Sequence, residues 1–349
     1  MIEIDGSRYS GSGTIVRQAV LFSALTGQAV HIVNARVRRP RPGLRHQHIR
    51  AAEAISELVN GEAEGFVPGS QEVTFRPGQL RVRGRHRWDI GSAGSTTMLA
   101  LAVLPVLAFA SLPVTVELRG GLFQDFAPSF FHFQQVILPL LTRMGFDATA
   151  EMVRPGYVPG GEGVMNLITQ PAARSLRPLS LEHARPVQGL WGVALASHLK
   201  ERRVSQRMAD AANKVLAPAG YRAEIELVDD TASVQPGAAL ALFADLGGEA
   251  RLGADRAGAV RRPAEAIGKY AATRLLEDLE SGATLDRFAT DQIIPFAALA
   301  EGESVFRVQA ETEHLVTNAW LARTFLGAEV KLEGQVLSIT GVGYRRANQ

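Results

Sequence analysis

The 349-residue sequence contains no cysteine. A disulfide framework, a thiolate zinc site and a cysteine nucleophile are therefore excluded, so any covalent catalysis must use another side chain. A secretory signal pattern is also lacking, because Glu3, Asp5 and Arg8 stand where such a signal would have an apolar run. Both absences are typical of a cytoplasmic protein, and we expect this location.

The sequence also lacks an uninterrupted apolar run that could cross a membrane. Residues 90–116 carry no charge, and this stretch is longer than the ~20 residues that a membrane helix needs. Pro105 and Pro113 interrupt it, however, and it opens with the small residues from Gly91 to Thr97. We therefore predict a turn followed by a buried helix, and no association with a membrane.

Carboxylates are missing from the region between Gly6 and Ala52. The same region contains eight arginines, which are Arg8, Arg17, Arg36, Arg38, Arg39, Arg41, Arg45 and Arg50. Such a span should create a positive potential that suits phosphate groups, and adjacent arginines would repel a metal cation. If a strand predicted from Gln28 to Val37 continues to its end, Arg36 and Arg38 share one face. The alternative interpretation is a solvated basic surface without a ligand.

The overall composition is that of a globular protein, with 46% hydrophobic and 21% charged residues and a net charge of +2. Residues 2–27 and 81–110 share one order: a short strand, a Gly/Ser-rich turn and an apolar helix. This order predicts repeated α/β units whose helices cover one face of each sheet. Apolar periodicity predicts further helices at Gln47–Val59, Phe130–Met144 and Leu315–Leu326, the last followed by a hairpin to Val342.

The pattern changes between about residues 185 and 282. It contains a charge cluster at Lys200–Arg203, and it predicts helices at Val204–Leu216 and Pro263–Leu279 and strands at Arg222–Val228 and Ala238–Asp245. We therefore predict an α/β (α+β) fold with two domains. The large domain comprises residues 1–182 plus 283–349, and a smaller inserted α/β domain comprises residues 183–282.

The turn Gly11-Ser12-Gly13 precedes a predicted helix. It offers backbone N–H groups and the positive end of the helix dipole to an anion. No Lys-Ser/Thr pair of a P-loop follows, and no GxGxxG spacing occurs, so the ordinary nucleotide-binding loops are not indicated. A tight strand-to-helix turn without a ligand explains the pattern about as well.

Short motifs spread over nearly the whole chain carry a resemblance to a known family. They are Ile4-Asp5-Gly6-Ser7, Arg17, Ala24-Leu25-Thr26-Gly27, Pro42-Gly43-Leu44 with Gln47-His48, Gly91-Ser92-Ala93-Gly94-Ser95, Ala127-Pro128, Arg154 with Gly156-Tyr157 and Pro159, Asp291-Gln292 with Pro295, and His314-Leu315 with Thr317-Asn318. In this order they resemble the RNA 3′-terminal phosphate cyclase family.

The resemblance implies a large domain of three repeated ββαβα-like units, with the smaller domain inserted before the last unit. It also implies an ATP-dependent, ligase-type reaction. In that reaction a histidine attacks the α-phosphorus of ATP, the AMP passes to an RNA 3′-phosphate, and the neighbouring 2′-hydroxyl closes a 2′,3′-cyclic phosphate. RNA 3′ ends would then be the partner, and a divalent metal, Mg or Mn, would be weakly held. The oligomeric state is not indicated.

Site residues follow from the same resemblance. His314 would be the adenylylated nucleophile, a role that suits an imidazole that is neutral near pH 7. The groups that bind phosphates and the RNA end would be Arg17, Arg36, Arg39, Gln47 and His48. The adenosine pocket would be lined by Phe288, Asp291, Gln292 and Pro128. The metal ligands are left unassigned.

The chain departs from the family pattern at several positions. Ser10 stands where the family has a metal-binding Glu, and Thr14 stands where that motif ends in Gln. Leu101 replaces a Gln placed against the nucleotide, and Phe123 replaces a polar residue. These changes favour a rival hypothesis, a non-catalytic cyclase-like protein that binds RNA in RNA processing. An enolpyruvyl transferase is a third alternative, which rests on fold likeness without a motif.

Overall fold

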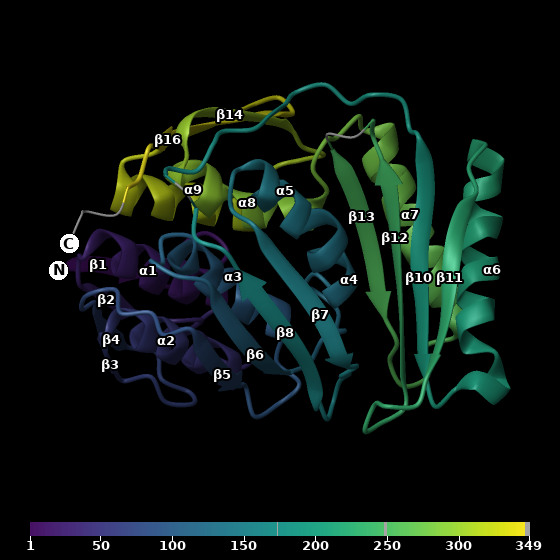
Figure 1. Ribbon diagram of the computed structural model, residues 1–349, viewed down its shortest axis with the longest axis horizontal. Helices are drawn as coiled ribbons and strands as arrows, with labels where there is room; N and C mark the ends of the chain where they lie inside the picture. Colours follow the sequence, from purple (N-terminus) through teal and green to yellow (C-terminus); the bar gives the residue numbers. More distant parts are fainter. Residues whose placement is uncertain (173, 248–249, 346–349) are drawn as a thin grey trace.

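The computed structural model describes residues 1–172, 174–247 and 250–345. In these residues the chain forms a mixed α/β fold with four sheets of four strands each. Figure 1 shows helices enclosed between sheets on one side of the molecule and a separate sheet with its two helices on the other.

The first sheet has the strand order β1-β2-β4-β3. Its chain order is β1 (Ile2–Asp5), α1 (Gly13–Thr26), β2 (Val30–Val33), α2 (His46–Val59), β3 (Glu62–Glu64) and β4 (Val73–Arg76). Helix α1 begins where the Ser12 hydroxyl accepts a hydrogen bond from the Thr14 N–H, and it ends at Gly27, whose φ of 71° favours glycine. These two caps explain why the start and end of this helix could be read from the sequence.

The second sheet has the order β5-β6-β8-β7. Its chain order is β5 (Arg85–Asp89), α3 (Thr96–Leu107), β6 (Val114–Gly120), a continuous helical run, β7 (Ala148–Arg154) and β8 (Gly163–Thr169). The helical run consists of α4 (Phe130–His132), a π-helical turn (Phe133–Ile137) and α5 (Leu138–Arg143). Within the charge-free stretch, residues Thr96–Leu107 form the buried helix α3, and no helix in the described residues is long and apolar enough to cross a membrane.

The third sheet has the order β9-β14-β16-β15. Its chain order is β9 (Ser180–Leu181), α8 (Arg287–Leu299), β14 (Glu301–Arg307), α9 (Glu313–Leu326), β15 (Glu329–Glu333) and β16 (Val336–Val342). The same strand order thus occurs three times, with the first two strands parallel each time. Each time the chain runs β-α-β-α-β-β, which corrects the ββαβα order implied by the resemblance.

The fourth sheet is built by the chain between β9 and α8. It contains β10 (Gly189–Ser197), α6 (Val204–Leu216), β11 (Ala223–Asp230), β12 (Gly237–Asp245), β13 (Arg251–Ala257) and α7 (Ala264–Glu280), with 3-10 turns at Lys200–Arg202 and Ala217–Ala219. Its order is β11-β10-β12-β13, and α6 and α7 pack against each other and against the sheet (Figure 1). The division into domains at residues 182 and 283 stays a prediction.

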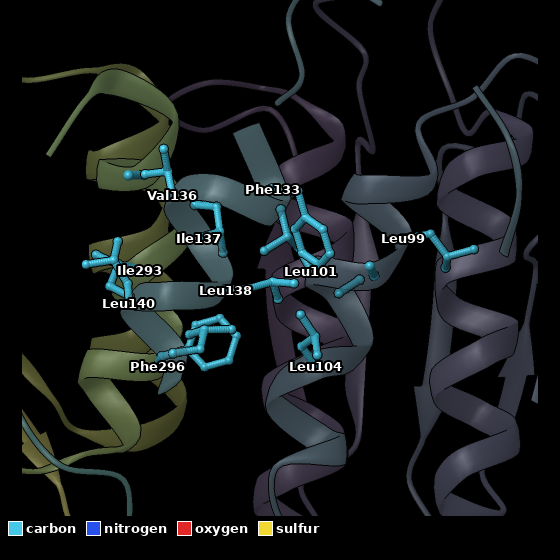
Figure 2. Close-up of a cluster of buried hydrophobic side chains, with 14 of the residues drawn as sticks. Leu99, Leu101, Leu104, Phe133, Val136, Ile137, Leu138, Leu140, Ile293 and Phe296 are labelled. Carbon is cyan, nitrogen blue, oxygen red and sulfur yellow. The ribbon is translucent and has the colours of Figure 1, made fainter. Parts of the chain in front are cut away.

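Helices from the first three sheets form a common core. Helix α1 packs against α9 and α3, and α3 also packs against α8. Figure 2 shows the side chains between α3, the helical run before β7 and α8, among them Leu101, Phe133 and Phe296. Leu101 is buried in this core, and Phe123 is likewise buried, so these two departures fill apolar space.

One predicted strand is wrong in its length. Strand β2 ends at Val33, four residues before the predicted end at Val37. Arg36 lies in a turn with a φ of 58° and does not share a strand face with Arg38. The chain turns here because the parallel pair β1 and β2 ends together at Asp5 and Val33.

Candidate functional site

A cavity of about 500 Å³ lies where helices from the first three sheets begin. Every site residue predicted from the sequence lines it: Arg17, Arg36, Arg39, Gln47, His48, Pro128, Phe288, Asp291, Gln292 and His314. The fold thus brings together residues that are up to 297 positions apart. The chemical roles of these residues remain proposals.

The first turns of five helices reach the wall of this cavity. The lining includes Thr14 of α1, Gln47 and His48 of α2, Met98 of α3, Phe288 of α8 and His314 of α9. Four of these helices follow a parallel strand directly, because β1, β2, β5 and β14 lead into α1, α2, α3 and α9, each of which starts beyond the carboxyl end of its strand, whereas α8 follows the fourth sheet. Helix α8 is capped by the carboxylate of Asp286, which accepts the N–H groups of Phe288 and Ala289. Helices α1, α2 and α3 have no acidic residue in their first turn and no carboxylate cap, so their N–H groups and dipoles favour an anion in the cavity.

Arg17 is the most deeply buried cation of the cavity. Arg17 is buried, with 9% of the residue surface exposed. Its Nη2 donates a hydrogen bond to the Thr14 hydroxyl at 3.3 Å. No carboxylate in the described residues pairs with it. Burial, and then the charge of Arg36, lowers the pKa of Arg17 to about 10, which leaves it charged at pH 7. A buried guanidinium without a counter-charge is unfavourable unless an anion joins it.

The other arginines divide between the cavity and the turn beside it. Arg36 donates its Nε to the Gly43 carbonyl at 3.0 Å, and burial lowers its pKa, with Arg39 and then Arg45 as further causes. Arg39 donates its Nη2 to the Ser10 carbonyl at 2.9 Å. Arg36 and Arg39 line the cavity and leave further N–H groups available to phosphate oxygens.

Arg38 has a different position. It donates to the carbonyls of Ser7 and Tyr9 at 3.0 and 3.1 Å, is exposed, and is not part of the cavity lining. The arginines after β2 thus have two structural roles. Arg38 and Arg39 hold the Ser7–Gly11 turn in place by hydrogen bonds, and Arg36 and Arg39 face the cavity.

His314 lies in the first turn of α9. Thr312 caps this helix, because its hydroxyl accepts a hydrogen bond from the Leu315 N–H at 2.9 Å. The Nδ1 atom of His314 is 3.1 Å from the Thr14 hydroxyl. Burial is the largest cause of a lowered pKa for His314, followed by the charges of Arg17 and Arg39. The imidazole is therefore neutral at pH 7.

His48 and Gln47 connect the first turns of three helices. A Cβ on Gly13 would overlap the His48 ring, so only glycine allows α1 to begin beside this histidine. His48 is buried, and burial, then the charge of Arg17, holds its pKa well below the usual range. Its Nδ1 accepts the Arg45 N–H at 3.0 Å, while the Gln47 Oε1 accepts the Ser95 N–H of α3 at 3.3 Å.

The residues predicted to hold the nucleotide belong to α8 and to the loop before α4. The buried carboxylate of Asp291 accepts the Thr312 hydroxyl at 2.8 Å, and burial raises its pKa to about 7. The Cζ atom of the Arg287 guanidinium lies over the ring of Phe288, 4.9 Å from the ring centroid. The Pro128 carbonyl is fixed by a hydrogen bond from the Thr97 hydroxyl at 2.7 Å.

Sequence reasoning missed the contribution of the fourth sheet. Asp255 and Arg256 of β13 and Tyr270 of α7 line the same cavity. Strand β13 was not predicted, because its sequence, Arg251–Ala257, contains three charged residues, three small residues and a single leucine, without an alternating apolar pattern. Thr14 stood out only as a departure from the family pattern, and nothing in the sequence places it against His314.

The position where a metal-binding Glu was missing does not face the cavity. Ser10 is buried, and its hydroxyl pairs with the hydroxyls of Ser12 and Thr317 at 3.0 and 2.9 Å. The described residues contain no group of three or more His, Asp or Glu side chains that could hold a metal ion. These residues therefore do not fit a metal cage of their own.

Comparison with known proteins shows the family of this chain. The profile of a family described as RNA 3′-terminal phosphate cyclase matches residues 8–332. The chain belongs to this family. Proteins named RNA 3′-terminal phosphate cyclase from Methanopyrus kandleri and Hyperthermus butylicus are 38% and 39% identical, covering 96% and 97% of this chain and 96% of each relative.

Among solved structures, the enolpyruvyl transferase NikO from Streptomyces tendae is 11% identical to this cyclase-family chain. The match covers 98% of this chain and 82% of NikO, with a TM-score of 0.28. A likeness this weak indicates nothing about the chemistry of the cavity, whereas membership of the cyclase family does.

Proposed function

We propose that this protein converts an RNA 3′-terminal phosphate into a 2′,3′-cyclic phosphate in an ATP-dependent reaction, through a covalent His314–AMP intermediate. The observation that carries the proposal is a neutral, half-buried imidazole that shares one cavity with five arginines and five helix N-termini. A nucleophile beside a strong anion site is what nucleotidyl transfer requires. Relatives that carry the name of this activity match nearly the whole chain.

The reaction would have three steps. His314 Nε2 attacks the α-phosphorus of ATP, a P–N bond forms, and the P–O bond to pyrophosphate breaks. An oxygen of the RNA 3′-phosphate then attacks the same phosphorus and releases the histidine. Finally the 2′-hydroxyl attacks the 3′-phosphorus, loses its proton and expels AMP. Arg17, Arg36 and Arg39 would stabilise the charge that develops on the phosphates in each step.

The other predicted residues would position the reactants. Phe288 and Pro128 would bound the adenine, while Asp291 and Gln292 would bind polar groups of the adenosine. Gln47 and His48 would hold the first turns of α1, α2 and α3 together. A divalent metal, Mg or Mn, would be held mainly by the ATP phosphates and water, because magnesium needs few protein ligands.

Thr14 would orient the nucleophile. The Thr14 hydroxyl oxygen receives the Arg17 N–H at 3.3 Å and lies 3.1 Å from the His314 Nδ1. A hydroxyl oxygen accepts two hydrogen bonds, so the Nδ1–H of His314 can donate to it as well. With the imidazole proton on Nδ1 and donated to Thr14, the Nε2 lone pair would be free for the attack.

Thr14→Val should therefore slow adenylylation at saturating ATP by about tenfold to a hundredfold, as when a partner that orients a histidine ligand in a metal site is removed. The ATP concentration for half-maximal rate should change little, since the valine keeps the shape. Single-turnover labelling measures both quantities. Thr14→Ser keeps the oxygen and should retain most of the rate. If the serine variant is as slow as the valine variant, Thr14 does not act through this oxygen.

The three sheets of equal strand order support a related structural proposal. We infer that they are repeats of one unit which together form a large domain, and that residues 183–282 form an inserted domain. Helix N-termini from all three repeats meet at the cavity, so the repetition itself would create the phosphate site.

One experiment tests the proposed activity. The protein is incubated with α-labelled ATP and a divalent metal, and then with a short RNA that ends in a 3′-phosphate. We expect an acid-labile, base-stable label on the protein, followed by an RNA end that phosphatase no longer attacks. The rival, a non-catalytic RNA-binding protein, is favoured by the absent Glu at Ser10. RNA binding without any protein label would establish that rival.

A further inference from the structure

The loop before α4 carries an aromatic side chain that the proposed reaction does not use. Phe126 is 95% exposed, and no other large apolar side chain among the described residues is exposed as fully. Its neighbours Phe123, Phe130, Phe131 and Phe133 are all buried. A single exposed apolar residue is ordinary on a protein surface, so the exposure alone indicates nothing. The position and surroundings of Phe126 are what point to a ligand.

The backbone on both sides of Phe126 is held in place. The Asp125 carboxylate receives two hydrogen bonds from Arg262, at 2.8 and 3.1 Å, and lies 3.4 Å from Arg256. On the other side, the Pro128 carbonyl is fixed by a hydrogen bond from α3. Phe126 itself has a φ of 66°, a conformation uncommon for a large side chain. The ring therefore projects outward from a fixed base.

Phe126 lines the cavity that contains His314. Arg256 and Arg287 line it as well, so the ring stands at the edge of a cationic site. The end of an RNA strand has the matching chemistry, because it combines phosphate charges with flat bases that stack on aromatic side chains. The adenine of ATP fits this ring less well, since a side chain with 95% exposure contacts almost no protein and cannot form one wall of an enclosed pocket.

We propose that Phe126 is a stacking platform for a base within the last two nucleotides of the RNA 3′ end. The proposal rests on the proposed function, because it takes this RNA end as the substrate. Stacking tolerates any base, so Phe126 would hold the end of an RNA irrespective of sequence. The arginines would hold the terminal phosphate, and the two contacts together would fix the ribose whose 2′-hydroxyl reacts.

The test measures binding of a short, fluorescent RNA with a 3′-phosphate to the full chain, by anisotropy. Phe126→Ala should weaken binding about tenfold, and Phe126→Trp should keep it, because tryptophan offers a larger stacking face. Val260→Ala is the matched control, since Val260 is 90% exposed in the neighbouring loop between β13 and α7, and it should bind as the wild type does. Labelling by ATP in the absence of RNA should be the same in all four proteins.

A second measurement identifies the base as the partner. RNAs with an abasic site at the last or the penultimate nucleotide are compared with the intact RNA. For one of the two abasic RNAs, the affinity of the wild type should fall by the same factor as Phe126→Ala causes with intact RNA. Phe126→Ala should bind this abasic RNA as tightly as it binds intact RNA. Such non-additivity is the signature of a direct contact.

Two outcomes would overturn the proposal. Equal RNA affinity of wild type and Phe126→Ala excludes stacking on this ring. A higher ATP requirement for labelling in Phe126→Ala, with RNA affinity unchanged, assigns the ring to the nucleotide instead. The proposed function is tested separately, because a wild type that never becomes labelled contradicts the reaction, whereas the abasic comparison still decides the role of Phe126.

Discussion

Replacing His314 with alanine is expected to abolish the transfer of AMP to the protein. The label should fall by more than about a thousandfold, because removal of a covalent nucleophile leaves no other atom to accept the phosphorus. The measurement is the yield of labelled protein after incubation with α-labelled ATP, with the modified residue located by mass spectrometry. Full labelling of His314→Ala would assign the nucleophile elsewhere.

Two controls distinguish the loss of the nucleophile from a loss of the fold. The only hydrogen bond of the His314 side chain in the described residues is to Thr14, and α9 is capped independently by Thr312, so the melting temperature should change by no more than about 2 °C. The wild type should also show the titration of His314. Burial and the nearby arginines lower the pKa from 6.5. Since a lowered pKa keeps the imidazole neutral to lower pH, the acid limb of the labelling rate should have its midpoint below 6.5. A midpoint above 6.5 would contradict a half-buried nucleophile flanked by arginines.

The helices of the fold could be predicted better than its strands. Helix α6 has the predicted bounds Val204–Leu216, and α1 ends at the predicted Gly27, because apolar periodicity and caps are local signals. Strand β13 was missed and β2 was predicted too long, since a strand is stabilised by partners that are distant in sequence. The three-fold recurrence of one strand order was visible in the sequence only as a weak repetition of two segments.

The sequence allowed us to predict which residues line the site, but not how the fold arranges them. Every predicted residue lines the cavity, because the resemblance transfers positions one by one. The convergence of five helix N-termini could not be predicted, since it depends on how three sheets are arranged in space. The same holds for Arg256, which the fourth sheet brings to the cavity, and for the contact between Thr14 and His314, which are 300 positions apart.

Arg17→Met is expected to stabilise the protein without ligand and at the same time to slow its reaction with ATP strongly. The pKa of Arg17 is lowered from 12.5 to about 10. In free-energy terms, such a shift means that burying this charge costs on the order of 3 kcal/mol at neutral pH. Methionine fills a similar volume without the charge, and replacing buried ionic groups by apolar side chains of similar volume is often neutral or stabilises a protein by ~1–4 kcal/mol. A site that keeps such an unfavourable group should need it for function.

The melting temperature without ligand should therefore rise in Arg17→Met while the rate of adenylylation falls. Without nucleotide, Arg17→Met should melt at a higher temperature than the wild type, whereas added ATP should stabilise only the wild type. Adenylylation should fall by about a hundredfold to a thousandfold, the loss expected when one group that stabilises transition-state charge is removed. Arg17→Lys is the matched control: it keeps the charge but loses the planar fork that binds two phosphate oxygens, so its activity should lie between the two. If Arg17→Met is less stable than the wild type and still becomes labelled at the normal rate, Arg17 is a packing residue, and the phosphates must bind to Arg36, Arg39 and the helix N-termini alone.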